Sequence, residues 1–224
     1  MGEVGDRYAT VRGRITSLVE GLDEAGASTT VPPCPQWSVK DVVAHVTGVC
    51  ADILGGRLEG VATDPWTQAQ VDERKDRSIR EIVAEWNEVA PQCEAIAEAF
   101  GDAGHQWVAD LTTHEHDIRT ALGEPGERGA EAVEVSCRWL ASRHVGEGFE
   151  RAFRVLTPEG DDIVLGEGDP QTTVKVGRFD FFRAITGRRS EEQIAAFGWE
   201  DDYKPFLGAF SRGPFTMATQ PFVE

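Results

Sequence analysis

The chain has 224 residues, of which 40% are hydrophobic and six are tryptophan, so its length suits one large domain or two small ones and its composition is that of a globular protein. Its 39 acidic residues against 22 basic ones give a net charge of −17, which argues against a nucleic-acid partner and against an anionic membrane surface. We find no signal peptide and no apolar run near the roughly twenty residues that span a bilayer, so we expect a cytoplasmic protein with reduced cysteines.

The first third of the chain predicts two amphipathic helices. Apolar residues recur at helical spacing over residues 7–24. A proline-bearing loop over residues 31–36 then leads to Ser38, which opens the S-x-x-D pattern of a capping box. The helix that begins there is expected to end at Gly55 and Gly56.

Two further helices complete the first half of the chain. Residues 60–77 are polar and predict an irregular surface loop, after which Ser78 opens a third helix. Pro91 is expected to kink or interrupt that helix. A fourth helix runs over about 107–122 and stops at Gly123. Four amphipathic helices with short connections predict an antiparallel four-helix bundle, a scaffold that often holds metals between facing helices.

The run from Gly123 to Gly129 is the clearest linker. After it, long amphipathic segments give way to short alternating ones. We expect a helix over about 131–148, then short strands and short helices. The strands fall at 152–156, 163–165 and 172–176, and the helices at 179–185 and after Ser190. The predicted fold class is therefore α+β, with a helical bundle in residues 1–125 and a small α+β domain in residues 126–224.

Three side chains of the predicted bundle are candidate metal ligands. His45 shares one helix face with Val42 and Val49. His114 lies on the apolar side of the fourth helix, and Asp110 precedes it by one turn. Two histidines and a carboxylate suit a divalent ion, and three protein ligands leave the open position that is typical of a catalytic site.

Neighbouring residues leave alternatives open. His116 is expected to face solvent or a loop, Glu115 lies off the ligand face, and His144 is a rival ligand from the next helix. Asp117 either orients a ligand imidazole or pairs with a surface lysine or arginine. A metal that only holds the bundle together is the simpler alternative, although structural zinc normally has four protein ligands.

The four cysteines contain no C-x-x-C pair. Cys50, Cys93 and Cys137 fall among apolar residues of helical segments, where a free cysteine behaves as a small hydrophobic residue. Cys34 lies in the proline-rich approach to the second helix, but no histidine stands at a recognisable offset from it. A catalytic role for Cys34 is therefore the less favoured interpretation.

Three separated motifs resemble one known family. The stretch from Cys34 to His45 resembles the opening of DinB-like metal-binding bundles, and in particular of the mycothiol-dependent maleylpyruvate isomerase family. The run from Asp110 to Gly123 resembles the second metal motif of that family, in which a carboxylate precedes a histidine by four residues and an aspartate follows by three. The segment 181–190 resembles its C-terminal part, which comes from a sterol-carrier-protein-like domain.

This resemblance implies a metal-dependent enzyme. It implies a divalent ion, zinc or alternatively nickel, held by His45, Asp110 and His114, and mycothiol as a thiol cofactor. The reaction is then isomerisation of a small cis-unsaturated acid or transfer of the thiol to a small electrophile, and the residues do not separate the two. The isomerases are expected to have glutamate where this chain has Asp110, so the ligand distance or the metal can differ.

Arg188 is the candidate catalytic residue outside the metal site. A substrate carboxylate or enolate needs a cation, and an arginine fork suits a carboxylate. Arg183 and Arg189 lie close by in sequence, although adjacent arginines are also common as a solvated surface pair.

Two other functions stay open. In one, the metal is structural and aromatic residues of the second domain line a groove for a hydrophobic ligand. These residues are Phe149, Phe153, Phe179, Phe181 and Phe182. In the other, the protein is a metal-dependent hydrolase, although no glutamate is obviously placed as its general base. The expected partners are a small-molecule substrate and the thiol, and the sequence leaves the choice between monomer and homodimer open.

Overall fold

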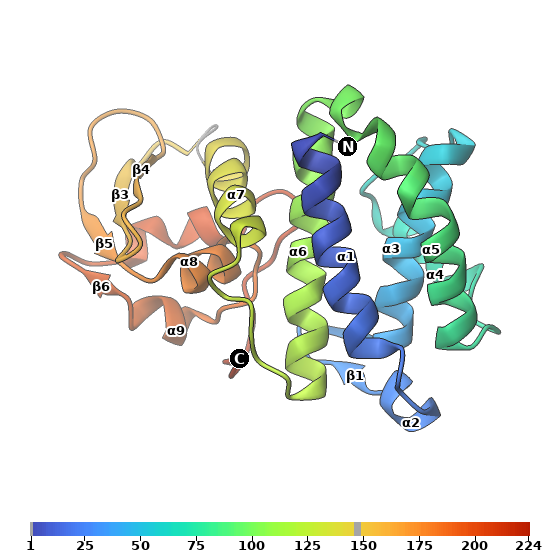
Figure 1. The fold of residues 1–224 in the computed structure, drawn as a ribbon. Helices are drawn as coiled ribbons and strands as arrows, with labels where there is room; N and C mark the ends of the chain where they lie inside the picture. Colours follow the sequence, from blue (N-terminus) through green and yellow to red (C-terminus); the bar gives the residue numbers. More distant parts are fainter. Residues whose placement is uncertain (1, 146–148) are drawn as a thin grey trace. The chain divides into compact units, whose positions relative to one another are not determined.

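The computed structural model describes the backbone of residues 2–145 and 149–224, and the side chains of all of these except His144 and Val145. The chain divides into two compact units, one up to Gly126 and the other over Glu127–Val223. The first unit is helical and the second combines helices with a small sheet, so the predicted α+β fold class is confirmed (Figure 1). Within the described residues, none of the helices is both long and apolar enough to span a membrane.

Four long helices form the bundle of the first unit. They are α1 (Glu3–Val19), α3 (Val39–Gly55), α5 (Ile79–Ile96) and α6 (Asp102–Leu122). Helices α1 and α6 run in the same direction, because Tyr8 stacks on Trp107 and, further along both helices, Arg14 pairs with Glu115. Helices α3 and α5 both run antiparallel to α1 and α6 (Figure 1). Many apolar side chains are buried between the four helices, and Trp86 is the largest of those that are fully buried.

Side chains fix where α3 and α5 begin. Ser38 accepts a hydrogen bond from the backbone N–H of Asp41, and the Asp41 carboxylate accepts one from the backbone N–H of Ser38. Ser78 and Glu81 repeat this capping box at the start of α5. The two capping boxes set the rotation of each helix, and therefore the face on which later residues lie.

Two local expectations are wrong, and a third is wrong in part. The polar segment 60–77 contains a helix, α4 (Asp64–Asp72), which begins with a proline in its first turn and buries only Gln70 and Val71, so its apolar periodicity is weak. The expected loop at 31–36 contributes to a short hairpin of β1 (Thr30–Val31) and β2 (Cys34–Ser38). Helix α5 continues through Pro91, so the proline does not interrupt it, and a kink at this position stays a prediction.

Short helical segments complete the connections of the first unit. They are α2 (Glu24–Ala27) and the 3₁₀ turn η1 (Ala97–Phe100). Helix α6 ends as predicted at Gly123, whose left-handed φ of 68° suits glycine.

The second unit places helices beside a four-stranded sheet of order β4-β3-β5-β6. Strand β3 pairs antiparallel with β4 and parallel with β5, and β5 pairs antiparallel with β6. The strands are β3 (Phe153–Leu156), β4 (Asp162–Leu165), β5 (Thr173–Lys175) and β6 (Gly198–Trp199). The helical segments are α7 (Glu131–Leu140), the π-helical turn η2 (Ala141–Val145), α8 (Arg178–Ile185), α9 (Glu191–Ala195) and the 3₁₀ helix η3 (Lys204–Phe210). The predicted helix over 131–148 therefore leaves the α-helical path at Leu140, and its last three positions lie outside the described residues.

Aromatic side chains form the core of the second unit. Phe153 is fully buried against Trp199, Phe206 and Phe210, with ring centroids 5.4–6.2 Å away. Phe181 and Phe182 are also fully buried, and Phe179 is nearly so. Four of the five phenylalanines considered for a ligand groove thus belong to the packed core, and Phe149 is half-buried.

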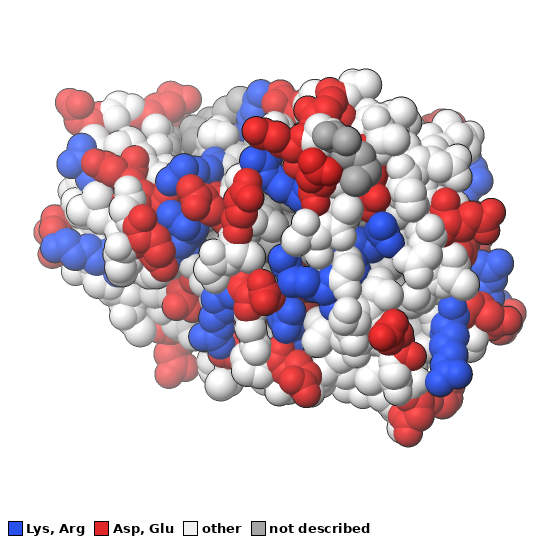
Figure 2. Space-filling model, viewed as in Figure 1, with Lys and Arg blue, Asp and Glu red and all other residues white. Residues whose placement is uncertain are grey.

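Acidic side chains are spread over the face of the molecule shown in Figure 2, interspersed with lysine and arginine. This distribution agrees with the net charge of −17.

Candidate metal centre

His45, Asp110 and His114 lie together inside the bundle, as predicted from the helical phase. The Nε2 atom of His45 is 3.4 Å from Oδ2 of Asp110, and the Nε2 atom of His114 is 3.6 Å from Oδ1 of the same carboxylate. One ligand atom from each of the three side chains lies within 4.8 Å of the other two. Helix α3 supplies the first histidine, and α6 supplies the carboxylate and the second histidine one turn apart.

The other ring nitrogen of His45 is held by Gln70. The Nδ1 atom of His45 lies 2.7 Å from Oε1 of Gln70, while Nε2 of Gln70 donates to Asp52 at 2.7 Å. Because the amide must donate to the carboxylate, its oxygen faces the imidazole and accepts the Nδ1 proton. Arg57 in turn donates to Asp52. The amide of Gln70 therefore fixes the tautomer of His45.

Asp117 holds His114 in the same way. Its Oδ2 atom lies 3.1 Å from Nδ1 of His114, and its side chain is fully buried. Of the two roles left open for Asp117, the geometry therefore supports orientation of an imidazole. A carboxylate that accepts the remaining N–H of a ligating histidine is a common partner in metal sites.

These contacts leave three lone-pair donors facing one another. With both Nδ1 protons committed to Gln70 and Asp117, the two Nε2 atoms present lone pairs toward the oxygens of Asp110. A positive charge between these donors, either a divalent ion or a proton on a ring nitrogen, makes the arrangement favourable. Two imidazoles and one carboxylate are a usual ligand set for zinc with one position open. The residues present therefore fit a divalent ion.

The ring of Trp37 packs beside both histidines. Its centroid lies 5.3 Å from that of His45 and 6.2 Å from that of His114. Trp37 belongs to β2, directly before the capping box of α3, so the short hairpin places this ring against the site.

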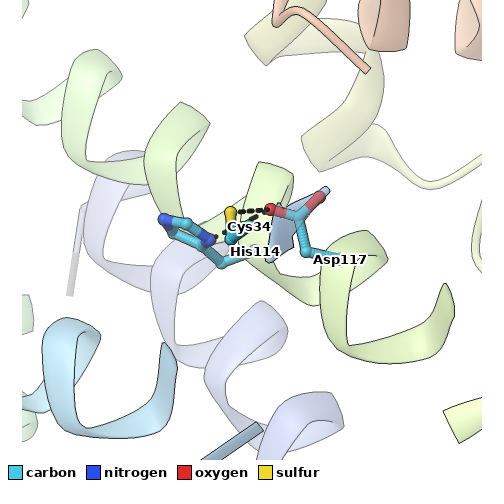
Figure 3. A group of neighbouring side chains, drawn as sticks. All are labelled: Cys34, His114 and Asp117. Atoms are coloured by element: carbon cyan, nitrogen blue, oxygen red, sulfur yellow. Dashed lines mark hydrogen bonds and ion pairs between the residues drawn. The ribbon is translucent and has the colours of Figure 1, made fainter. Parts of the chain in front are cut away.

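Cys34 also lies near the site in a position that the sequence did not predict. Its thiol is half-buried and lies 3.8 Å from Oδ2 of Asp117, the atom that also accepts from His114 (Figure 3). Cys34 and Asp117 are 83 residues apart, and no local spacing connects them. The hairpin of β1 and β2, which was expected as a loop, brings them together.

His116 does not face solvent, because it is 3% exposed, and the alternative that it faces a loop stays a prediction. Every residue of α6 from Leu111 to Ile118 is buried. Helix α6 packs against α1, α3 and β1, so its flank away from the ligand face is covered as well. Glu115 is off the ligand face as expected, and it accepts hydrogen bonds from Arg14 and Arg119. The rival ligand His144 lies outside the described side chains.

The arginines considered for a substrate carboxylate belong to the second unit. Arg188 donates to the backbone oxygen of Thr186 and is half-buried. Arg183 is fully buried, and Arg189 is 4% exposed and pairs with Asp180 at 2.8 Å. Arg188 and Arg189 are therefore not a solvated surface pair, and the catalytic role of Arg188 stays a prediction.

Comparison with known proteins places the chain in a family. Residues 8–125 match the sequence profile of the mycothiol maleylpyruvate isomerase N-terminal domain. The chain belongs to this family. The predicted resemblance is thus confirmed over residues 8–125, which include both segments that carry the candidate ligands.

Two solved structures resemble this member of the family over most of its length. One is the mycothiol-dependent maleylpyruvate isomerase, with a TM-score of 0.56, 12% identity, and coverage of 84% of this chain and 90% of the other. The second is a histidine-to-alanine mutant of the mycothiol-dependent maleylpyruvate isomerase, with a TM-score of 0.57, 11% identity, and coverage of 83% and 88%. At these identities the likeness shows a shared fold. No curated protein sequence matches the chain significantly.

Proposed function

We propose that this family member is an enzyme that binds a divalent ion, zinc or alternatively nickel, through His45, Asp110 and His114, and that it uses mycothiol as its thiol. Its reaction is isomerisation of a small cis-unsaturated acid or transfer of the thiol to a small electrophile. The observation that carries the proposal is the convergence of two imidazole Nε2 atoms on one carboxylate, with each Nδ1 already engaged. Family membership supports the choice of thiol.

The protein's own residues define how a small molecule reaches this centre. The side chains of His45 and His114 are 6% and 8% exposed, whereas that of Asp110 is 39% exposed. A ligand therefore approaches from the side of Asp110, while Gln70 and Asp117 keep the two rings fixed from behind. When bound, a zinc-like ion supplies the Lewis acidity that ionises a coordinating thiol near neutral pH.

The hydrolytic alternative needs a general base, and the glutamate nearest in sequence to the ligands does not provide one. Both carboxylate oxygens of Glu115 accept hydrogen bonds from Arg14, and Arg119 donates to one of them as well. Both oxygens of this carboxylate are thus engaged by arginine side chains and are not directed at the metal ligands. The contacts of Glu115 therefore favour thiol chemistry over metal-dependent hydrolysis.

Metal content tests the ligand set. Elemental analysis of the purified protein is expected to give one divalent ion per chain, and His45→Ala and His114→Ala are each expected to lose it. His105→Ala is the matched control, because His105 is half-buried on α6 outside the cluster. A wild-type protein without metal after reconstitution, or alanine variants that keep it while folded, would overturn the proposal.

The fate of the thiol separates the two reactions. Addition to a cis double bond followed by elimination returns the thiol unchanged, whereas transfer consumes one thiol per product. The assay follows free mycothiol and product together, with a cis-unsaturated dicarboxylate and with an epoxide as substrates. Arg188→Ala is expected to lower turnover and leave the metal content unchanged. An unchanged turnover would remove Arg188 from the proposal.

A further inference from the structure

A second group of ligand atoms lies on the Nδ1 side of His114. It consists of the Sγ atom of Cys34, a ring nitrogen of His114 and a carboxylate oxygen of Asp117, which all lie within 4.8 Å of one another. Figure 3 shows the sulfur beside the ring nitrogen that contacts Asp117. This group shares only one residue with the centre formed by His45, Asp110 and His114.

The spacing of the second group suits a small tetrahedral ion. Oδ2 of Asp117 is 3.1 Å from Nδ1 of His114 and 3.8 Å from Sγ of Cys34. With metal–ligand bonds of about 2.1 Å to nitrogen and oxygen and about 2.3 Å to sulfur, tetrahedral ligand atoms lie about 3.4–3.6 Å apart. The two observed distances therefore lie within about 0.3 Å of the tetrahedral values.

The chemistry of this group differs from that of the first. It contains a sulfur donor, and sulfur ligands favour soft ions such as Cd²⁺ or Zn²⁺. Cys34 is half-buried, whereas Asp117 is fully buried and His114 nearly so. The thiol is therefore the outermost of the three donors and the first that an incoming ion meets.

We propose that Cys34, His114 and Asp117 form a soft-metal site that competes with the first centre for His114. Ion binding releases the thiol proton of Cys34 to solvent and moves the imidazole proton of His114 from Nδ1 to Nε2. The metal–nitrogen bond forms at Nδ1, and Asp117 exchanges its hydrogen bond from His114 for a bond to the ion. With Nε2 protonated, His114 no longer ligates at the first centre. The site depends on His114 but not on metal binding by His45 or Asp110.

A Cd²⁺ titration followed by ultraviolet absorption tests the site, because a thiolate bound to Cd²⁺ gives a charge-transfer band. The His45→Ala variant lacks a ligand of the first centre but keeps all three of the second. It is expected to bind one Cd²⁺ with this band, and His45→Ala combined with Cys34→Ser is expected to lose it. His45→Ala combined with Cys137→Ala is the control and keeps the band, because Cys137 is buried in the other unit.

Competition is tested with zinc-loaded wild-type protein. The band is expected to develop at a higher Cd²⁺ concentration than in His45→Ala, because the ion must first take His114 from the zinc. Equal Cd²⁺ midpoints for zinc-loaded wild type and His45→Ala would show that the two sites do not compete for His114. A folded His45→Ala variant without the band, or a band that survives Cys34→Ser, would overturn the site itself. If His45→Ala does not fold, Asp110→Asn serves in its place. Failure of this site leaves the metal content of the wild type unaffected, so it is distinguishable from failure of the proposed function.

Discussion

The amide oxygen of Gln70 lies 2.7 Å from Nδ1 of His45 and ties helix α4 to the candidate metal centre. The contact is buried, and the amide is itself oriented by its hydrogen bond to Asp52. A second contact fixes the backbone of α4, since Arg74 donates to the carbonyl of Gln70 at 3.0 Å. A helix that buries little apolar surface of its own thus positions an imidazole of the neighbouring helix.

Gln70→Leu is expected to weaken metal binding by about 10- to 100-fold. The Nδ1–H of His45 loses its hydrogen-bond acceptor in this variant, and the tautomer of the ring is no longer fixed. Competition with a chromogenic chelator measures the affinity. Gln68→Leu is the matched control, since Gln68 is exposed on the same helix and is expected to leave the affinity unchanged. Equal affinities of wild type and Gln70→Leu would remove Gln70 from the centre.

Gly48→Ala is expected to impair the same contact from the side of α3. A Cβ atom at position 48 would lie 2.5 Å from Cβ of Gln70, so the residue on α4 must move away. We expect a lower thermal unfolding midpoint and a metal affinity reduced as in Gln70→Leu. Gly13→Ala on α1 is the control, because a Cβ atom there meets nothing within 4 Å and alanine favours a helix. A Gly48→Ala protein with wild-type affinity would show that α4 adapts without loss.

The candidate ligands were predictable because each depends on local rules. The capping box at Ser38 fixes the phase of α3, and the 3.6-residue period then places His45 inward. The spacing of Asp110 and His114 by one helical turn similarly defines one face of α6.

The residues that support these ligands were not predictable in the same way. Gln70 lies on a helix that buries only Gln70 itself and Val71, so hydrophobic periodicity gives no signal. Cys34 meets Asp117 only through tertiary pairing of a short hairpin. The burial of His116 depends on the packing of neighbouring elements against α6, which a helical period alone does not reveal.

Cys34 is expected to be the first cysteine alkylated in the native protein. Its side chain is half-buried, whereas Cys50, Cys93 and Cys137 are at most 1% exposed. Burial also raises the pKa of Cys137 to about 12 and that of Cys50 well above its usual value, so their reactive thiolate forms are scarce. Iodoacetamide labelling followed by peptide mass spectrometry should find one modified cysteine before the others. Early modification of Cys137 would contradict this order.

The ionised carboxylate of Asp161 makes a pH-dependent contribution to the stability of the second unit. Burial opposes ionisation of its carboxyl, but hydrogen bonds from Arg178, Thr157 and Arg138 outweigh that effect and lower its pKa from 3.8 to about 2. Because the pKa is lower in the folded than in the unfolded chain, the ionised form stabilises the fold. This contribution, about 2 kcal/mol, is present above pH 4 and is lost as the pH falls toward about 2.

Urea unfolding of the second unit between pH 2 and pH 7 measures this effect. Asp161→Asn is expected to lower the free energy of unfolding at pH 7 by about 2 kcal/mol, because the buried Arg178 and the exposed Arg138 both lose a charged acceptor. The variant is also expected to lose less stability than the wild type between pH 4 and pH 2. Asp162→Asn is the control, since the side chain of Asp162 is 60% exposed and meets Arg154 at 3.3 Å on the surface. If both variants lose the same stability at pH 7, the buried arginine contacts do not depend on the charge of Asp161, and the acid sensitivity of this unit comes from other carboxylates.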